Sequence, residues 1–65
     1  MDIKSKLTKR ELEIAILAKE GLSDQEVTVR LDISLHTVKN HFKSIYRKLN
    51  VQTRPKLVAL LNKEK

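Results

Sequence analysis

With 65 residues, the chain is long enough for one domain with a small core, so we expect residues 1–65 to form a single domain that has no deep catalytic cleft and is not an enzyme. It lacks cysteine, a signal peptide and any apolar run near the roughly 20 residues that span a bilayer, so we expect a cytoplasmic protein without metal, cofactor or membrane attachment. The formal net charge of +6 instead favours an anionic partner.

Helical periodicity runs through the whole chain. One glycine and one proline leave few breaks, and apolar residues recur at three- and four-residue steps rather than alternating. The pattern predicts an all-α fold with loose ends at residues 1–6 and 63–65. Four helices are expected, at about residues 9–19, 24–31, 35–49 and 54–62.

The first two helices begin with matching start signals. Thr8 is followed three residues later by Glu11, and Ser23 by Glu26, which is the spacing of a capping box. Gly21 stands where a left-handed residue ends the first helix. The inward stripe of the first helix is expected to contain Leu7, Ile14, Ala15 and Ala18, and that of the second Val27 and Leu31.

A very short segment separates the second and third helices. Asp32 tolerates a left-handed turn conformation, and Ser34 is well suited to cap the next helix. The spacing therefore predicts a helix-turn-helix. The third helix should bury Val38, Phe42, Ile45 and Leu49; the fourth, which tolerates Pro55 in its first turn, should turn Leu57, Val58 and Leu61 inward.

Positive charge is concentrated in the second half of the chain. Residues 1–33 carry a balance of −1 and residues 34–65 one of +7, with no acidic residue from 35 to 61. Such a stretch is typical of a polyanion-binding surface, although a solvated face kept for solubility is an alternative.

The outward face of the third helix carries this charge. Residues three and four apart share a helix face, so His36, Lys39, Asn40, Lys43 and Arg47 should project together away from the core. Lysine can bond the acceptor edge of guanine, and asparagine can pair with adenine in the major groove. We therefore expect base contacts from Lys39, Asn40 and Lys43; an idle face or one that binds an acidic protein remains the alternative.

Phosphate contacts are expected at the margins of the same face. Free backbone N–H groups at the start of the helix suit an anion, and hydroxyl or cationic side chains there can hold the docking register. The residues concerned are Ser34, His36, Thr37, Arg47 and Lys48.

Several segments at fixed spacing resemble one known family. They are residues 7–11, 21–27, 31–34, 37–41 and 48–51, followed by Arg54. Over about residues 5–62 the chain resembles the LuxR-type DNA-binding domain, also found in GerE-like and NarL/FixJ-like regulators. The resemblance implies a bacterial transcription regulator that binds double-stranded DNA with its third helix in the major groove.

The resemblance also implies roles for individual residues. Lys39 and Lys43 match base-contacting positions, and Asn40 occupies the variable position between them that helps to set sequence preference. Arg10 and Glu11 look structural, and Glu11 is expected to pair with a basic residue across the fold. Backbone contacts are implied for Thr37, Lys48, Thr53 and Arg54, and a dimer surface on the fourth helix for Leu57, Leu60 and Leu61.

The expected partners are double-stranded DNA and a second copy of the chain, paired only weakly without DNA because a short helix buries little area. RNA polymerase, or a regulatory domain preceding residue 1, is a further candidate.

Three positions depart from the family pattern. Thr28 replaces a small alanine, which we expect the fold to tolerate, and Leu12 and Ile16 replace charged residues. These two form either a broader buried face or a contact with a partner.

Two other functions remain as alternatives. One is a protein-interaction module that uses the fourth helix with Leu12 and Ile16, and the other is a promoter-reading domain of a sigma factor. Steep log-linear weakening with salt would favour DNA binding over the interaction module.

Overall fold

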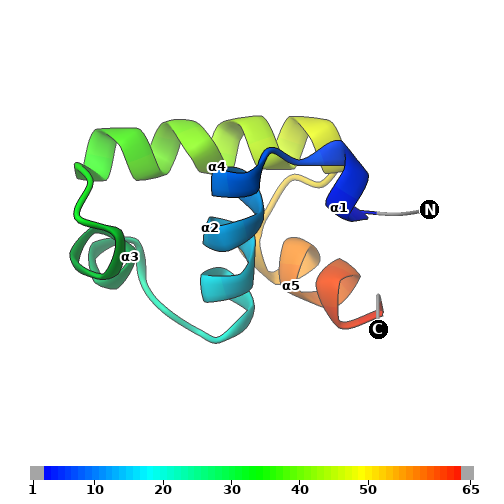
Figure 1. Ribbon diagram of the computed structural model, residues 1–65. Coiled ribbons are helices and arrows are strands. Elements are labelled where there is room, and N and C mark those ends of the chain that lie inside the picture. Colours follow the sequence, from blue (N-terminus) through cyan, green and yellow to red (C-terminus); the bar gives the residue numbers. More distant parts are fainter. Residues whose placement is uncertain (1–2, 64–65) are drawn as a thin grey trace.

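The computed structural model describes residues 3–63 and is helical, without strands in that range, as predicted (Figure 1). None of the helices within it has the length and apolar character of a membrane-spanning segment. The helices are α1 (Ile3–Lys6), α2 (Lys9–Lys19), α3 (Asp24–Leu31), α4 (Leu35–Leu49) and α5 (Arg54–Lys63).

The prediction of loose ends at both termini was wrong for the residues that the structure describes. Ile3–Lys6 form one turn of helix, and Ile3 is buried at 4% exposure in the core. α5 runs through Lys63, one residue beyond its expected end. Burial of one apolar side chain orders a segment too short to be recognised by periodicity. Residues 1, 2, 64 and 65 lie outside the described residues.

Both predicted capping boxes are confirmed. The Thr8 hydroxyl accepts the Glu11 N–H at 3.1 Å, while the Glu11 carboxylate accepts the Thr8 N–H at 2.9 Å. Ser23 and Glu26 make the same pair of bonds at 3.2 and 2.8 Å. In α3 the Thr28 hydroxyl donates to the carbonyl of Gln25, so this departure from the family pattern has its polar group satisfied within its own helix.

Left-handed residues end three of the helices. Gly21 has φ +94° and Asp32 has φ 55°, as the sequence predicted. Asn50, which was expected only to lie in a connector, caps α4 at φ 57°. The turn from α4 to α5 therefore depends on a residue that tolerates this conformation.

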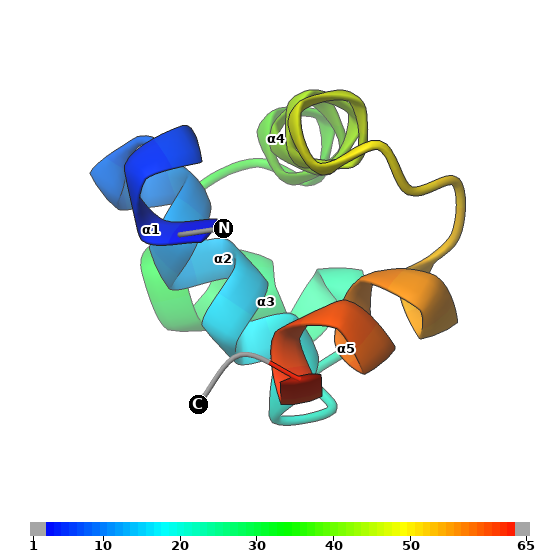
Figure 2. The ribbon, with the colours of Figure 1, turned by 90° about the vertical axis from the view of Figure 1, so that its right-hand side faces the viewer.

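Helix α2 is the centre of the core, with α4 and α5 packed against it. Viewed along its axis, α4 lies at one edge of the molecule, and α2, α3 and α5 lie below it (Figure 2). The predicted inward stripes are buried in α2 and α4, and Val27, Leu57 and Leu61 are buried in α3 and α5. The packing leaves the far side of α4 open along the length of the helix (Figure 1).

A buried carboxylate joins α2 to α4. Glu11 is only 5% exposed; its Oε1 accepts Lys48 Nζ at 2.7 Å, and its Oε2 accepts the Ser44 hydroxyl at 2.7 Å. The expected pairing of Glu11 with a basic residue is thus confirmed. Burial alone raises the pKa of the Glu11 carboxyl, but the bonds from Lys48, Thr8 and Ser44 outweigh it and lower the pKa from 4.5 to about 2.

We predict that Glu11→Gln lowers the free energy of unfolding by roughly 1–3 kcal/mol near neutral pH, because Lys48 loses its anionic partner and buried donors lose an acceptor. Since the pKa of Glu11 lies below its ordinary value, this stability is fully present above pH 4.5 and is lost as the pH falls toward about 2. Urea unfolding followed by helical circular dichroism measures it.

The matched control is Glu13→Gln. Glu13 is 47% exposed and pairs with Arg10 on the same helix at 3.3 Å, so its loss should cost less than about 1 kcal/mol. Equal stability of wild type and Glu11→Gln near neutral pH, or a difference that persists unchanged down to pH 2, would contradict the assignment.

We predict that Asn50→Ala lowers the free energy of unfolding by about 1 kcal/mol, whereas Asn50→Gly leaves it unchanged or raises it, because glycine and asparagine adopt the left-handed conformation far more readily than alanine. Thermal melting of the three proteins measures the difference. Alanine and glycine variants of equal stability would refute the role given to this turn.

Candidate nucleic-acid interface

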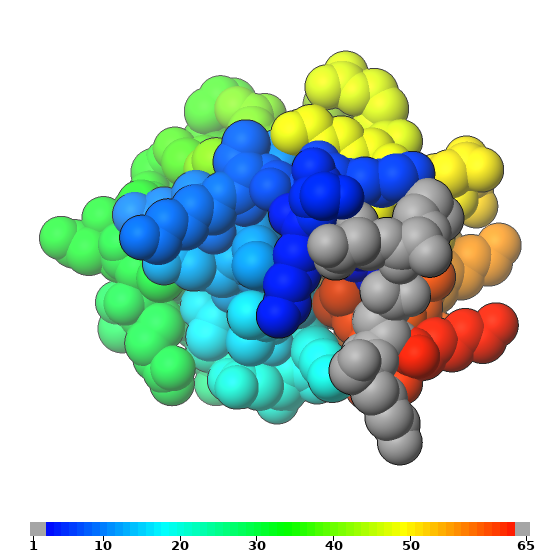
Figure 3. Space-filling model, turned by 45° about the vertical axis from the view of Figure 1, so that its right-hand side comes forward, coloured from blue at the N-terminus to red at the C-terminus, as the bar shows by residue number. Residues whose placement is uncertain are grey.

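The two long faces of α4 differ in burial as the sequence predicted. Val38 and Ile45 are fully buried, and Phe42 and Leu49 are nearly so. Side chains in the green-to-yellow colours of α4 stand at the upper edge of the space-filling view, beyond those of α1 and α2 (Figure 3). The exposed residues of the opposite face are His36, Lys39, Asn40, Lys43 and Arg47.

Three cations on this exposed face form no ion pair within the described residues. Among residues 3–63, the ion pairs join Arg10 to Glu13, Lys48 to Glu11 and Arg54 to Asp24, and none involves Lys39, Lys43 or Arg47. These cations share one side of one helix and face solvent. Uncompensated like charges on a rigid rod form a positive potential that attracts polyanions.

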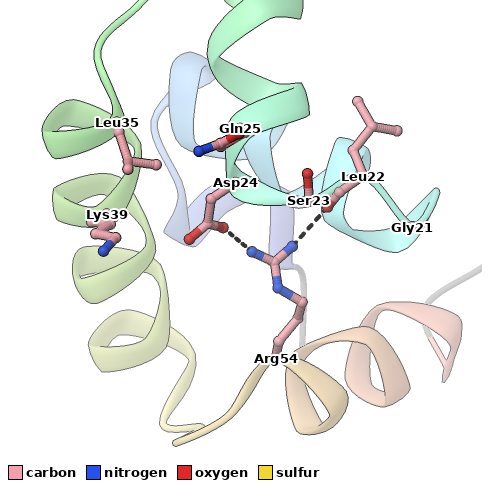
Figure 4. A pocket seen from close by; sticks show the side chains of 8 residues that line it. All are labelled: Gly21, Leu22, Ser23, Asp24, Gln25, Leu35, Lys39 and Arg54. Carbon is pink, nitrogen blue, oxygen red and sulfur yellow. Dashed lines mark hydrogen bonds and ion pairs between the residues drawn. The ribbon is translucent and has the colours of Figure 1, made fainter.

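Two other predicted phosphate-binding residues are held within the fold. Lys48 pairs with Glu11, and the side chain of Lys48 is 34% exposed. Arg54, at the start of α5, donates from Nη1 to the carbonyl of Leu22 at 3.0 Å and from Nη2 to the Asp24 carboxylate (Figure 4). Both cations therefore have an internal partner, unlike Lys39, Lys43 and Arg47.

Arg54 connects three elements. Its guanidinium carbon lies 4.4 Å from the centroid of the Phe42 ring on α4, while its nitrogens bond the entrance to α3. Beside it, burial raises the pKa of the Tyr46 hydroxyl. Asp24 and Leu22, the partners of Arg54, were not predicted; they lie 30 and 32 residues away in the sequence, and no local pattern signals such a contact. The bonds fix α5 against the helix-turn-helix.

The predicted hydroxyl residues lie at helix starts. Ser34 caps α4 by accepting the Thr37 N–H at 3.1 Å, and the two hydroxyl oxygens are 2.9 Å apart. Thr53 accepts the Lys56 N–H at 3.3 Å at the start of α5. Ser34 and Thr53 are exposed, and Thr37 is partly exposed. As capping residues, they hold these hydroxyl oxygens close to the N-terminal ends of α4 and α5, where backbone N–H groups point outward.

His36 and Asn40 are bonded to each other. The Asn40 amide nitrogen Nδ2 lies 3.1 Å from His36 Nε2, one turn along the exposed face of α4. His36 was expected to contact phosphate and Asn40 to contact a base. The structure brings the two side chains together between the cations.

The predicted dimer surface of α5 needs correction. Leu57 is fully buried and Leu61 is 7% exposed, because both fill the core against α2, so neither has surface to offer a second copy. Leu60 is half-buried. Val58, expected to face inward, is half-buried and lines a shallow hollow between α5 and the end of α2 together with Ala18, Lys19, Gly21, Arg54, Pro55, Ala59 and Asn62.

The apolar strip of α2 is only partly covered. Leu12 is half-buried against the core, whereas Ile16 remains 44% exposed beside Glu13, Leu17, Arg30 and Leu31. The prediction of a broader buried face therefore holds for Leu12 but not for Ile16.

The chain matches the family model of bacterial regulatory proteins of the luxR family, GerE, over residues 5–61. It is 41% identical over 58 residues to the monoamine regulon transcriptional regulator of Klebsiella aerogenes, across 89% of this chain and 26% of that protein. It is 41% identical over 59 residues to the oxygen regulatory protein NreC of Staphylococcus carnosus, across 91% of this chain and 27% of that protein.

It is also 44% identical over 52 residues to the response regulator protein VraR of Staphylococcus aureus, across 80% of this chain and 25% of that protein. The chain thus spans about a quarter of the length of these curated relatives. No solved structure gives a significant match. The family match covers almost all of the described helices. The chain therefore belongs to the LuxR family of bacterial regulatory proteins, and its fold is that of a DNA-binding domain of transcription regulators.

Proposed function

We propose that this domain binds double-stranded DNA in a sequence-dependent manner by inserting the exposed face of α4 into the major groove. The observation that carries the proposal is the set of unpaired cations Lys39, Lys43 and Arg47 on one exposed helix face. The major groove admits an α-helix, and lysine and arginine donate to the N7 and O6 acceptors of guanine.

Base reading is assigned to the middle of the face. Lys39, Asn40 and Lys43 lie within little more than one helical turn, and all three are exposed. The core contacts of Val38 and Phe42 hold the backbone between them in a fixed orientation. A rigid scaffold under exposed polar groups is what base discrimination needs, since misplaced donors lose their directional bonds.

Phosphate contacts are assigned to the ends of the same helix and the start of α5. Ser34, His36, Thr37 and Thr53 offer polar groups near helix starts, and Arg47 extends the cationic face toward the end of α4. Lys48 and Arg54 approach phosphates as members of ion pairs, so we expect them to contribute less attraction than Arg47.

Pairing of two copies on DNA is assigned to the outer side of α5. Val58 is half-buried and Ala59 exposed, and both border the hollow between α5 and the end of α2. One short helix buries too little area for a tight dimer in solution, so we expect pairing chiefly on two adjacent half-sites.

The relatives suggest the wider setting. One is named as a response regulator protein and one as a transcriptional regulator, and each is about four times as long as the matched region. We infer that this domain acts as the DNA-binding part of a transcription regulator in a bacterial cytoplasm, in company with a regulatory domain and RNA polymerase.

We predict that Lys43→Glu lowers affinity for a duplex selected from a random pool by on the order of 100-fold, because it removes a donor and places a negative charge against the groove. The helical circular dichroism should not change, since Lys43 is exposed. Binding is measured by fluorescence anisotropy across a range of salt concentrations, where the wild type should weaken log-linearly.

The control is Lys63→Glu, which makes the same charge reversal at the far end of α5, away from α4 (Figure 1). Screening should keep its effect within about threefold at physiological ionic strength. Equal losses in the two variants would show that net charge, and not the α4 face, governs binding.

We predict that Ala59→Asp abolishes cooperative binding to two adjacent half-sites and leaves affinity for one half-site nearly unchanged, because it places a charge in the apolar contact between copies. Ile16→Asp, an apolar-to-acid change at an exposed position of α2, is the matched control. Gel-shift titrations on one- and two-site duplexes measure both. Loss of cooperativity in Ile16→Asp alone would contradict the assignment to α5 and indicate that the pairing surface lies on α2.

A further inference from the structure

We propose that His36 orients the Asn40 carboxamide and thereby makes Asn40 select adenine, an inference that rests on the proposed function of α4. The two residues are four apart on the exposed face of the helix, and Asn40 Nδ2 lies 3.1 Å from His36 Nε2. Side chains at this spacing are neighbours on a helix surface. The bond holds the amide of Asn40 in one of its two orientations before any ligand arrives.

The chemistry of the two groups fixes the direction of this bond. An amide nitrogen only donates, so His36 Nε2 accepts, and the proton of the neutral ring lies on Nδ1. Asn40 keeps its second amide N–H and its carbonyl oxygen Oδ1 for a ligand. It therefore presents one donor beside one acceptor.

This donor–acceptor pair matches adenine better than the other bases. In the major groove adenine offers the N7 acceptor beside the N6 donor, whereas guanine offers two acceptors. Thymine offers one acceptor and a methyl group, and cytosine one donor. Only adenine satisfies both free groups of the oriented amide.

The side chains around Asn40 on this face offer no free acceptor, so its carbonyl oxygen Oδ1 supplies the acceptor that they lack. Lys39, Lys43 and Arg47, the exposed cations of the same face, can only donate, and the Nε2 acceptor of His36 is already bonded. If residue 36 were a pure donor, the amide would rotate to place Oδ1 toward it. Both N–H groups would then face the DNA, and the preference would move toward the acceptors of guanine.

The hydrogen bond is tested first without DNA. Long-range ¹H–¹⁵N spectra in mildly alkaline buffer report which ring nitrogen of His36 carries the proton. The proposal predicts Nδ1 protonation in the wild type and a loss of this preference in Asn40→Ala. Protonation on Nε2 in the wild type, or a tautomer ratio that Asn40→Ala leaves unchanged, overturns the proposal.

The base preference is tested on four duplexes that differ only at the base pair whose discrimination disappears in Asn40→Ala. The wild type should prefer adenine there by about 5- to 150-fold, the range for one bidentate contact. His36→Gln restores an acceptor at the same spacing and should keep the preference. His36→Lys supplies only donors and should shift the preference toward guanine. The readout is a ratio between duplexes, so the added charge of lysine cancels.

Three results separate the explanations. If His36→Gln and His36→Lys change the affinities for all four duplexes equally, His36 acts only as a phosphate contact and does not orient Asn40, and the proposal is overturned. A wild-type preference for a base other than adenine overturns it as well. If the wild type binds no duplex, the proposed function and the base-reading role fall together, while the tautomer measurement still reports on the His36–Asn40 bond.

Discussion

The exposed face of α4 depends on the buried carboxylate of Glu11. Through Ser44 and Lys48 this one side chain ties α4 to α2, and through its capping bond to Thr8 it also fixes the start of α2. The carboxylate is almost inaccessible to water, so its hydrogen bonds replace the hydration that it has lost. The orientation of α4 is thereby set by directional polar bonds as well as by apolar packing.

The lysine and arginine side chains consequently have two different roles. Lys48 and Arg54 neutralise carboxylates of the fold and hold α4 and α5 in place, whereas Lys39, Lys43 and Arg47 have no such partner among residues 3–63. A small core is marginal for a chain of this size, so cross-links between helices add useful rigidity. The fold thus uses part of its basic charge for its own stability and leaves the rest on one helix face.

Local features of the sequence predicted local structure well. Two capping boxes, a glycine and apolar residues at helical spacing located α2 to α5 within a residue or two, because each depends on neighbours within one helical turn. The contacts of Arg54 with Asp24 and Leu22 and the helical turn at Ile3 depend on how distant segments pack, and no local pattern contains that information. For the same reason, residue type alone did not show that Lys48 pairs with a carboxylate of the fold whereas Lys43 does not.

An NMR titration of the ¹⁵N-labelled chain with a selected duplex tests the central claim most directly. The account predicts shifts concentrated at the α3–α4 turn and along the exposed positions of α4, with the Glu11–Lys48 and Asp24–Arg54 ion pairs intact in the complex. Shifts confined to the outer sides of α2 and α5, with the exposed amides of α4 unmoved at saturating DNA, would contradict it.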